Sequence, residues 1–325
     1  MEGSRTAFVT GGSGFIGSAL IARLAREGWA VRALARSEGS AAKVAESGAE
    51  VVRGDLSDVG VIREGAGGCD VAFHLAAKVG DAGRWEEFQQ ATVQGTTNAL
   101  AACRAAGVPR FVHAGTEAAL MEGQPLVRAD ETWPLKPDSP AYYPRSKARA
   151  EQAVRAAAAP GFETVVLRPR LVWGPDDTTL LPILVDMVRS GRFAWVGGGR
   201  HRTSPTHVDN VVEGLMLAAE RGRSGEAYFV TDGEAVVFRD FVTRLLATQG
   251  VEAPEREVPA RLARPLGAAA ESLWRTLRLP GEAPLTRFAV WNATLECTID
   301  DSKARRELGY EPVVSIEQGL AALSA

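Results

Sequence analysis

The stretch Thr10-Gly11-Gly12-Ser13-Gly14-Phe15-Ile16-Gly17 decides the fold of this chain. It follows an apolar run at 7–9 and opens a pattern at 19–24 that is typical of a helix. Glycines spaced in this way allow a tight turn, a close approach of backbone N–H groups to a pyrophosphate, and close packing of helix on strand. We therefore predict a strand and a helix with a dinucleotide bound at the turn between them. The alternative is a glycine-rich turn without a ligand.

Apolar runs and helical patterns alternate after this turn. Further strands are predicted at 29–35, 49–53, 71–77, 110–114 and 164–168, with helices from about 85 to 106 and from 145 to about 159. Alternation at this spacing indicates βαβ units with right-handed crossovers. The predicted fold class is therefore α/β, a Rossmann doubly wound parallel sheet, in which ligands lie beyond the carboxyl ends of the strands.

The regular alternation thins after residue 172. We expect residues 1–172 and about 207–235 to form the dinucleotide-binding domain. Residues from about 173 to 206 and from 236 to 325 are expected to form a smaller, mostly helical substrate-binding lobe. Leu273, Trp274, Phe288 and Trp291 lie in this lobe, where they either line an apolar pocket or belong to its core.

Composition limits the class of protein. The chain has 325 residues, of which 46% are hydrophobic and 24% charged, and its formal net charge is -3. That charge gives no global field to attract nucleic acid or an anionic membrane. The three cysteines are widely spaced, which predicts reduced thiols in a cytoplasmic protein. The sequence has no leader-like N-terminus and no apolar run near 18 residues, so we expect neither export nor a membrane span. The histidine spacing predicts no metal site.

The end of the second predicted strand indicates which dinucleotide is bound. An acid there would bond the adenosine ribose hydroxyls of NAD, whereas an arginine pairs with the extra phosphate of NADP. The chain has Arg36, with Glu38 two residues later. We predict NADP(H); NAD(H), or a solvated Arg36 without a role, is the alternative. After the third strand, Asp55 and Leu56 are placed to reach the adenine, although Asp55 is equally suited to cap the next helix.

Tyr143 and Lys147 carry the predicted chemistry, because their spacing of four residues puts them on one face of a helix. An ammonium group favours phenolate, and lowering the pKa of a tyrosine from ~10 to near 7 needs about 4 kcal/mol. A tyrosine tuned in this way donates a proton to a carbonyl oxygen as hydride arrives, or removes one from an alcohol. Lys147 would also hold the nicotinamide ribose. Thr116 is the candidate hydroxyl for the substrate oxygen, with a turn or a helix cap as the alternative.

Together these motifs resemble the extended short-chain dehydrogenase/reductases over nearly the whole chain. The matching segments are 10–17, 54–56, 74–77, 116, 143–147, 167–170 and 207–210. Trp173-Gly174-Pro175 and the stretch 279–288 are most similar to the 3β-hydroxysteroid dehydrogenase-like branch, which includes bacterial 2-alkyl-3-oxoalkanoate (β-keto acid) reductases. The resemblance implies Tyr143 as acid/base, Lys147 as its partner and Thr116 in the position usually held by serine.

The resemblance also implies the cofactor contacts. The positions lie at the first glycine turn, at predicted strand ends or on the catalytic helix: Gly11, Gly14, Phe15, Ile16, Arg36, Asp55, Leu56, Ala76, Ala77, Lys78, Tyr143, Lys147 and Pro169. Thr92 stands where the family often has asparagine, which leaves the family's asparagine-bound water in question. The family implies a homodimer through the helices near 90–105 and 145–159.

We therefore predict an NADP(H)-dependent oxidoreductase that interconverts a ketone and a secondary alcohol on a lipophilic small molecule. Steroid-like compounds, β-keto acids or esters and aryl ketones are the candidate substrates. A non-enzymatic NADP(H)-binding redox sensor is an alternative, but such a protein needs neither Tyr143 nor Lys147.

A second alternative is a sugar-nucleotide epimerase or dehydratase with tightly held NAD. In that case Arg170 and residues 200–202 would bind the diphosphate, although a solvated loop beside 197–199 is the favoured explanation of these residues. Dehydratases of the family carry two acids after the threonine, whereas here Glu117 is followed by Ala118. Arg36 also argues against epimerases, which retain NAD.

Overall fold

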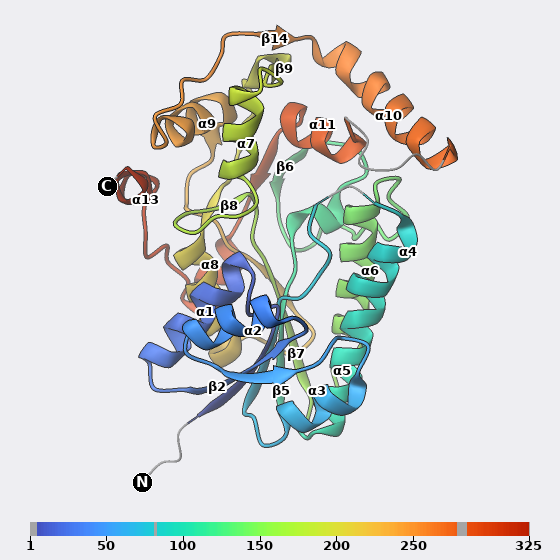
Figure 1. Ribbon diagram of the computed structural model, residues 1–325, viewed down its shortest axis with the longest axis vertical. Coiled ribbons are helices and arrows are strands. Elements are labelled where there is room, and N and C mark those ends of the chain that lie inside the picture. The colour runs from blue at the N-terminus through green and yellow to red at the C-terminus, as the bar shows by residue number, and fades with distance from the viewer. Residues whose placement is uncertain (1–4, 81–82, 278–284, 325) are drawn as a thin grey trace.

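A seven-stranded parallel sheet forms the centre of the molecule. The structure is a computed structural model that describes residues 5–80, 83–277 and 285–324. The strand order is β12-β7-β5-β4-β1-β2-β3, and every neighbouring pair is parallel (Figure 1). The strands are β1 (Thr6–Thr10), β2 (Ala30–Ala35), β3 (Glu50–Arg53), β4 (Val71–His74), β5 (Arg110–Ala114), β7 (Glu163–Arg168) and β12 (Ala227–Phe229). The order reverses between β1 and β4, the position at which doubly wound sheets bind ligands, and the predicted fold class is confirmed.

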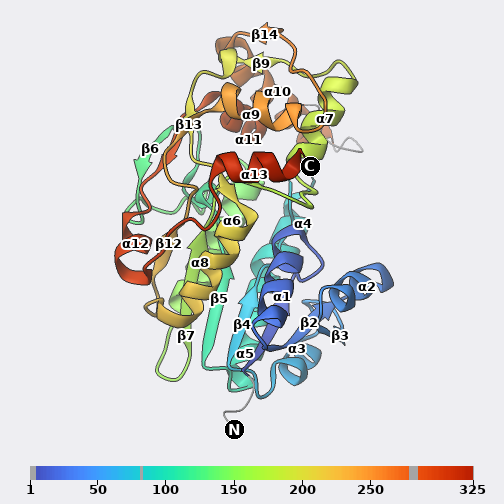
Figure 2. The same ribbon diagram turned by 90° about the vertical axis from the view of Figure 1, so that its left-hand side faces the viewer.

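Helices cover both faces of this sheet (Figures 1 and 2). One face carries α1 (Phe15–Arg26), α2 (Glu38–Glu46) and α8 (Val208–Arg221), and the other carries α3 (Val59–Ala66), α5 (Gly95–Ala105) and α6 (Tyr142–Ala156). Side chains of successive strand residues point to opposite faces. Val9 therefore packs with the first set and Phe8 with the second, and both are fully buried.

The predicted helix at 85–106 is interrupted. It consists of α4 (Trp85–Phe88), a π-helical turn η1 (Gln89–Gln94) and α5. The Thr92 hydroxyl in this turn accepts a hydrogen bond from the Lys78 backbone N–H at 3.0 Å. The predicted helical segment is therefore confirmed, and the π turn within it is a detail that hydrophobic periodicity does not distinguish. Such turns occur frequently at functional sites.

A smaller lobe lies beyond the carboxyl ends of the main strands (Figure 1). Its helices are α7 (Leu181–Arg189), η3 (Gly197–Gly199), α9 (Phe238–Ala247), α10 (Ala260–Leu277), α11 (Arg287–Thr294) and α13 (Ile316–Leu323). Short strands join them: β8 (Val172–Trp173), β9 (Trp195–Val196), β10 (Arg202–Thr203), β11 (Thr206–His207), β13 (Val236–Val237), β14 (Glu257–Val258) and β15 (Cys297–Ile299).

Two elements connect the parts of the molecule in ways that the sequence pattern did not predict. β6 (Leu126–Ala129) pairs with β15, so the smaller lobe contains a four-stranded sheet of order β13-β10-β15-β6. α12 (Ser302–Leu308) packs on α8 and β12, and its buried Leu308 joins the core of the main sheet. Within the described ranges, no helix has the length and apolar character needed to cross a membrane.

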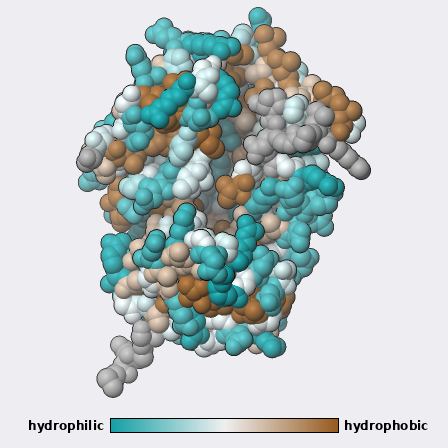
Figure 3. All heavy atoms as spheres, viewed as in Figure 1, coloured by the Kyte–Doolittle hydropathy of each residue, from teal (hydrophilic) through white to brown (hydrophobic). Residues whose placement is uncertain are grey.

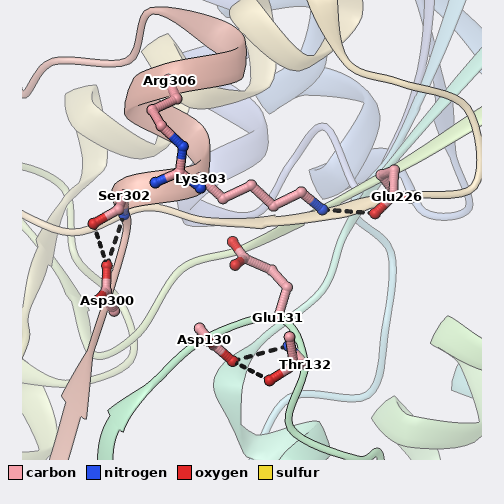
Figure 4. Close-up of a pocket in the computed structure, with 8 residues that line it drawn as sticks. All are labelled: Asp130, Glu131, Thr132, Glu226, Asp300, Ser302, Lys303 and Arg306. Atoms are coloured by element: carbon pink, nitrogen blue, oxygen red, sulfur yellow. Dashed lines mark hydrogen bonds and ion pairs between the residues drawn. The ribbon is translucent and has the colours of Figure 1, made fainter.

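Side chains cap the outer edge of β12. Glu131 accepts a hydrogen bond from the Phe229 backbone N–H at 2.8 Å, and Lys303 donates to the Ala227 carbonyl at 2.9 Å and to Glu226 at 2.6 Å. These groups belong to a crevice of about 300 Å³ (Figure 4). It is lined by Asp130, Glu131, Thr132, Glu226, Asp300, Ser302, Lys303 and Arg306, none of which is a predicted site residue.

Candidate active site

The glycine turn brings bare backbone to the carboxyl end of β1. Gly11 has a φ of 76°, and a Cβ there would lie 2.6 Å from the Ala76 backbone nitrogen. A Cβ on Gly17 would lie 2.1 Å from the Gly11 carbonyl oxygen. Only glycine fits at both positions, and the close approach joins α1 to the ends of β1 and β4.

The N-terminus of α1 is suited to an anion. Gly14 is its N-cap, and the described residues provide neither a side-chain cap nor an acid in the first turn. The backbone N–H groups of Phe15 and Ile16 therefore remain for a ligand, and the helix dipole favours negative charge there. These features fit the pyrophosphate of a nicotinamide dinucleotide.

The predicted cofactor residues lie at the carboxyl ends of neighbouring strands. Arg36 follows β2 and is exposed; among the described residues its side chain has no hydrogen-bond or ion-pair partner. Ala76 and Ala77 follow β4 and are partly exposed, while Pro169 follows β7 and is buried. Lys78 forms an ion pair with Glu87 at 2.9 Å, so its ammonium group is held by the protein.

In the turn after β3, Asp55 does not cap the next helix, which was one of its two predicted roles. Asp58, not Asp55, caps α3 by accepting from the Val61 backbone N–H at 3.1 Å. Asp55 accepts from the backbone and hydroxyl of Ser57 at 3.0 and 3.1 Å and is exposed. The carbonyl of Leu56 accepts from Asn98 at 2.9 Å, which ties this turn to α5.

Tyr143 and Lys147 occupy the first turns of α6, as predicted from their spacing. Tyr143 is partly buried, and its ring lies 5.2 Å from that of Phe288, centroid to centroid. Burial raises the pKa of the Tyr143 phenol, the Glu117 carboxylate raises it further, and hydrogen bonding with Thr116 opposes the shift. The expectation that Lys147 lowers this pKa was therefore wrong for the protein alone, since burial dominates.

Lys147 is fixed against β5. Its ammonium group donates to the Ala114 carbonyl at 2.8 Å, and the side chain is buried. Burial lowers the pKa of Lys147 to about 8, and Glu151 acts in the opposite direction. Because an ammonium group has three donors, two remain for ribose hydroxyls.

Thr116 lies two residues after β5, in the helix-cap position that was the alternative prediction for it. Its hydroxyl accepts from the Ala118 backbone N–H at 3.2 Å, so it caps the 3₁₀ helix η2 (Glu117–Leu120). The same hydroxyl donates to the Glu117 carboxylate at 2.7 Å. The Thr116 proton therefore points to the Glu117 carboxylate.

Glu117 and Arg170 form a buried ion pair beside Thr116. Their side-chain atoms are 2.6 Å apart, and the two residues are 4% and 2% exposed. Arg170 also donates to the Thr203 hydroxyl at 3.1 Å, so the pair connects η2 with the smaller lobe. Sequence reasoning missed this pair as part of the site. The available signal was an acid next to the candidate hydroxyl, but its partner is 53 residues away.

A histidine bridge joins β1, β4 and α5 below the site. The Thr96 hydroxyl donates to the Thr92 carbonyl at 2.6 Å, so its oxygen accepts from His74 Nε2 at 3.0 Å. His74 Nδ1 then accepts from the Thr10 hydroxyl at 2.7 Å. Burial and the nearby Lys147 charge lower the pKa of His74 to about 3, which agrees with a neutral ring.

The smaller lobe supplies an apolar wall next to Tyr143. Phe288 of α11 contacts the Tyr143 ring, and Trp291 of the same helix is buried in the core with Leu120 and Met121. Leu273 is 53% exposed, so it does not belong to that core. Figure 3 shows a hollow at the centre of this face, between the smaller lobe and the main sheet. Part of the resembling stretch at 279–288, residues 279–284, lies outside the described residues.

The arginines proposed for a sugar diphosphate do not converge. Arg170 is committed to Glu117, Arg200 lies 3.6 Å from Glu257, and Arg202 donates to the Ala235 carbonyl at 2.6 Å. Each side chain therefore has a different partner within the protein. Arg200 is 77% exposed in its side chain, whereas Arg170 is buried.

The fold, the glycine turn and the Tyr143–Lys147 pair define an oxidoreductase of the extended short-chain dehydrogenase/reductase type. Comparison with protein families makes this assignment more specific, because residues 8–260 match the 3-beta hydroxysteroid dehydrogenase/isomerase family. The chain belongs to this family. Its members' chemistry is oxidoreduction at a CH–OH group with a nicotinamide dinucleotide.

Two curated relatives are reductases. The 4-hydroxy-2-methyl-3-oxo-4-farnesyl-3,4-dihydroquinoline-1-oxide ketoreductase of Stigmatella aurantiaca is 50% identical over 97% of this chain and 95% of its own. The 2-alkyl-3-oxoalkanoate reductase of Stenotrophomonas maltophilia strain K279a is 40% identical over 98% of both chains.

Solved structures share the architecture. The crystal structure of gox2253 has a TM-score of 0.80 at 30% identity, covering 99% of this chain and 97% of that one. DesIV, a dTDP-glucose 4,6-dehydratase from Streptomyces venezuelae with NAD and TYD bound, has a TM-score of 0.75 at 26% identity and covers 98% and 95%. The same scaffold thus serves more than one reaction.

Proposed function

We propose that this protein is an NADP(H)-dependent ketoreductase for a lipophilic substrate. The observation that carries the proposal is the arrangement of Tyr143 and Lys147 on α6. They lie beside Thr116 and at the same end of the sheet, the carboxyl ends of its strands, as the glycine turn. The ketoreductase and reductase names of the relatives support it. The reaction class is the reduction of a ketone to a secondary alcohol, with the reverse oxidation available to the same groups.

Tyr143 is the proposed proton donor. Since its pKa is raised, the phenol is protonated at neutral pH and gives its proton to the carbonyl oxygen. The bound nicotinamide supplies the hydride. Lys147 holds the ribose with the donors that Ala114 leaves free, and its positive charge stabilises the phenolate left after proton transfer.

Two features support the choice of cofactor and substrate class. Arg36 is exposed at the end of β2, where its guanidinium group can pair with the ribose phosphate of NADP(H). Phe288 presents an aromatic ring beside the reacting phenol, which suits an apolar substrate body. The farnesyl and alkyl groups named for the relatives' substrates agree with that interpretation.

The test is NADPH consumption against long-chain β-keto esters, prenylated quinolone ketones, steroids and aryl ketones, with dTDP-glucose as the contrasting substrate. We expect turnover with one of the lipophilic ketones and none with the sugar nucleotide. Conversion of dTDP-glucose without net consumption of cofactor would support the dehydratase alternative. Tight NADPH binding without turnover, unchanged in Tyr143→Phe, would support the sensor.

A further inference from the structure

Arg53 is the last residue of β3 and lies beside the end of β2. It is in register with Ala35, and the Gly54 backbone N–H donates to the Ala35 carbonyl at 3.1 Å, which joins the two strand ends. Arg36 follows Ala35 directly. Because the two strands are parallel, both arginines lie at the carboxyl end of the sheet, where Arg36 is proposed to pair with the adenosine ribose phosphate of NADP(H).

The guanidinium group of Arg53 has two contacts with the start of α2, the helix that packs next to β2 and β3 (Figure 2). Its Nη1 donates to the Ser37 carbonyl at 2.8 Å, and its Nη2 donates to the Glu38 carboxylate at 2.5 Å. The Ser37 carbonyl is itself held, because it also accepts from the Ser40 hydroxyl at 2.9 Å in the capping box of α2. One side of the guanidinium group is thus anchored on backbone, while the other holds an acid.

The ion pair of Arg53 and Glu38 is open to solvent. The Glu38 side chain is 93% exposed and the Arg53 side chain 46% exposed. A pair of this kind contributes little free energy, because water screens both charges and fixing two long side chains costs entropy. A phosphate monoester carries about 1.5–2 negative charges at neutral pH and three acceptor oxygens. It is therefore a stronger acceptor for a guanidinium group than an exposed carboxylate is.

Glu38 is the acid that opposes phosphate binding at this turn. It lies two residues after Arg36, close to the place where an acid accepts from the ribose hydroxyls of NAD. Its contact with Arg53 directs the carboxylate toward β3 and balances its charge. Asp55, the next acid after β3, is occupied by Ser57. The set of Arg36, Glu38 and Arg53 consequently keeps a net positive charge.

We propose that Arg53 is a second residue that recognises the adenosine ribose phosphate and, together with Arg36, determines the preference for NADP(H). When the dinucleotide binds, Nη2 of Arg53 exchanges the Glu38 carboxylate for a phosphate oxygen, while Nη1 keeps the Ser37 carbonyl. Glu38 then turns to solvent. The inference rests on the proposed use of NADP(H), and it assigns phosphate recognition to two neighbouring strand ends in place of one.

The test is the affinity of the full chain for adenosine 2′,5′-diphosphate and for adenosine 5′-monophosphate, measured by titration calorimetry. The two ligands differ only in the ribose phosphate, and neither carries a nicotinamide. Binding needs no substrate and no turnover, so its result is independent of the ketoreductase assignment. Fluorescence titration with NADPH and NADH extends the comparison to the whole cofactor.

We expect wild-type protein to prefer the diphosphate. Arg53→Gln should lose about tenfold in affinity for the diphosphate and little for the monophosphate, because one charge-assisted contact is removed. Glu38→Gln should gain about two- to fivefold for the diphosphate, since the competing acid is absent. The double variant Arg53→Gln/Glu38→Gln should again bind the diphosphate about tenfold more weakly than Glu38→Gln does, because Arg53 contacts the phosphate directly.

The matched control is Arg244→Gln, which breaks an ion pair with Glu317 in the smaller lobe. That pair has the same separation, 2.5 Å, and comparable side-chain exposure, 47% and 75%. This variant should keep wild-type affinity for both ligands. Thermal unfolding of each variant checks that the fold is retained.

Four outcomes would overturn the proposal. Equal affinity of wild type for the two ligands would refute the NADP(H) preference itself, whereas full selectivity in Arg53→Gln would remove only Arg53 from phosphate recognition. A loss in Arg53→Gln that disappears in the Glu38→Gln background would show that Arg53 merely holds Glu38 away from the ligand. Similar losses for both ligands would assign Arg53 to the shape of the turn.

Discussion

The hydroxyl of Thr116 donates to the carboxylate of Glu117 across 2.7 Å, which places a buried negative charge beside the proposed acid/base Tyr143. The charge is held there by Arg170, 2.6 Å from the other carboxylate oxygen. The arrangement keeps the phenol protonated, a condition that favours proton donation to a ketone over removal of a proton from an alcohol.

Glu117→Gln should therefore shift the pH profile. The amide keeps one acceptor oxygen, for either Thr116 or Arg170, because these two donate to different oxygens of the carboxylate. Loss of the charge should lower the pKa of Tyr143 by about one unit. Alcohol oxidation measured as kcat against pH should reach its plateau at lower pH. Glu122→Gln is the control, since it removes a surface carboxylate outside the site. An unmoved profile in an active Glu117→Gln enzyme would refute the electrostatic role.

Tyr143→Phe should reduce kcat for ketone reduction by about 10²–10⁴-fold, because it removes the proton donor and little else. Dinucleotide affinity, measured by fluorescence titration, should change little. Tyr142→Phe is a matched control on the adjacent residue, whose ring packs near Trp85 and Phe88. Comparable activity of the two variants would remove Tyr143 from the reaction.

Lys147 should set an alkaline limit for ketone reduction. Its pKa of about 8 in the protein alone means that the side chain is charged below this pH and neutral above it. The value of kcat/KM for ketone reduction should therefore fall as pH rises through about 8. In an active Lys147→Arg enzyme, this fall in kcat/KM should move to higher pH, because the guanidinium group keeps its charge. A fall in kcat/KM at the same pH in Lys147→Arg would show that another group titrates there.

Arg36→Asp should shift the preference from NADPH to NADH. Loss of a charge-assisted contact is worth about 1.5–3 kcal/mol, which corresponds to about a ten- to hundredfold change in the ratio of kcat/KM values. Arg104→Asp changes an exposed arginine on α5 and should leave the ratio unaltered. An unchanged ratio in Arg36→Asp would show that the phosphate is recognised elsewhere.

Gly17→Ala should cost stability and dinucleotide affinity, since the new methyl group would approach the Gly11 carbonyl to 2.1 Å. We expect a loss of about 1–3 kcal/mol in the free energy of unfolding, measured with urea. Gly39→Ala in α2 is the contrasting variant. A Cβ there has nothing within 4 Å, and alanine favours the helix, so its stability should be equal or higher. Equal stability of both variants would contradict the packing argument.

The sequence predicted the main sheet because each strand and helix repeats a strong local pattern. Periodicity from Thr6 to Arg168 marks the strands, and parallel βαβ units then bring their carboxyl ends to one edge. Tyr143, Lys147 and Thr116 were recognisable as candidates because their spacing and their position near strand ends suit acid/base chemistry. Their assigned roles stay predictions until variants are measured.

Other parts of the site depend on contacts between distant residues. Glu117 contacts Arg170, which is 53 residues further along the chain. β6 pairs with β15, and the separation there is about 170 residues, because the Arg128 backbone N–H donates to the Thr298 hydroxyl at 2.8 Å. Most strands of the smaller lobe have two residues, which is too short for an alternating pattern to be recognised. The raised pKa of Tyr143 likewise follows from burial, which the pairing with Lys147 in the sequence does not indicate.

The side chains over β12 bear on how copies of this protein behave at high concentration. An open strand edge offers N–H and carbonyl groups to another chain and favours edge-to-edge pairing of two sheets. Here Glu131 occupies the Phe229 N–H and Lys303 the Ala227 carbonyl, so the edge presents charged side chains in place of a hydrogen-bonding template. The side chains drawn in Figure 4 thus guard one of the two edges of the seven-stranded sheet, the β12 edge, against pairing with another chain.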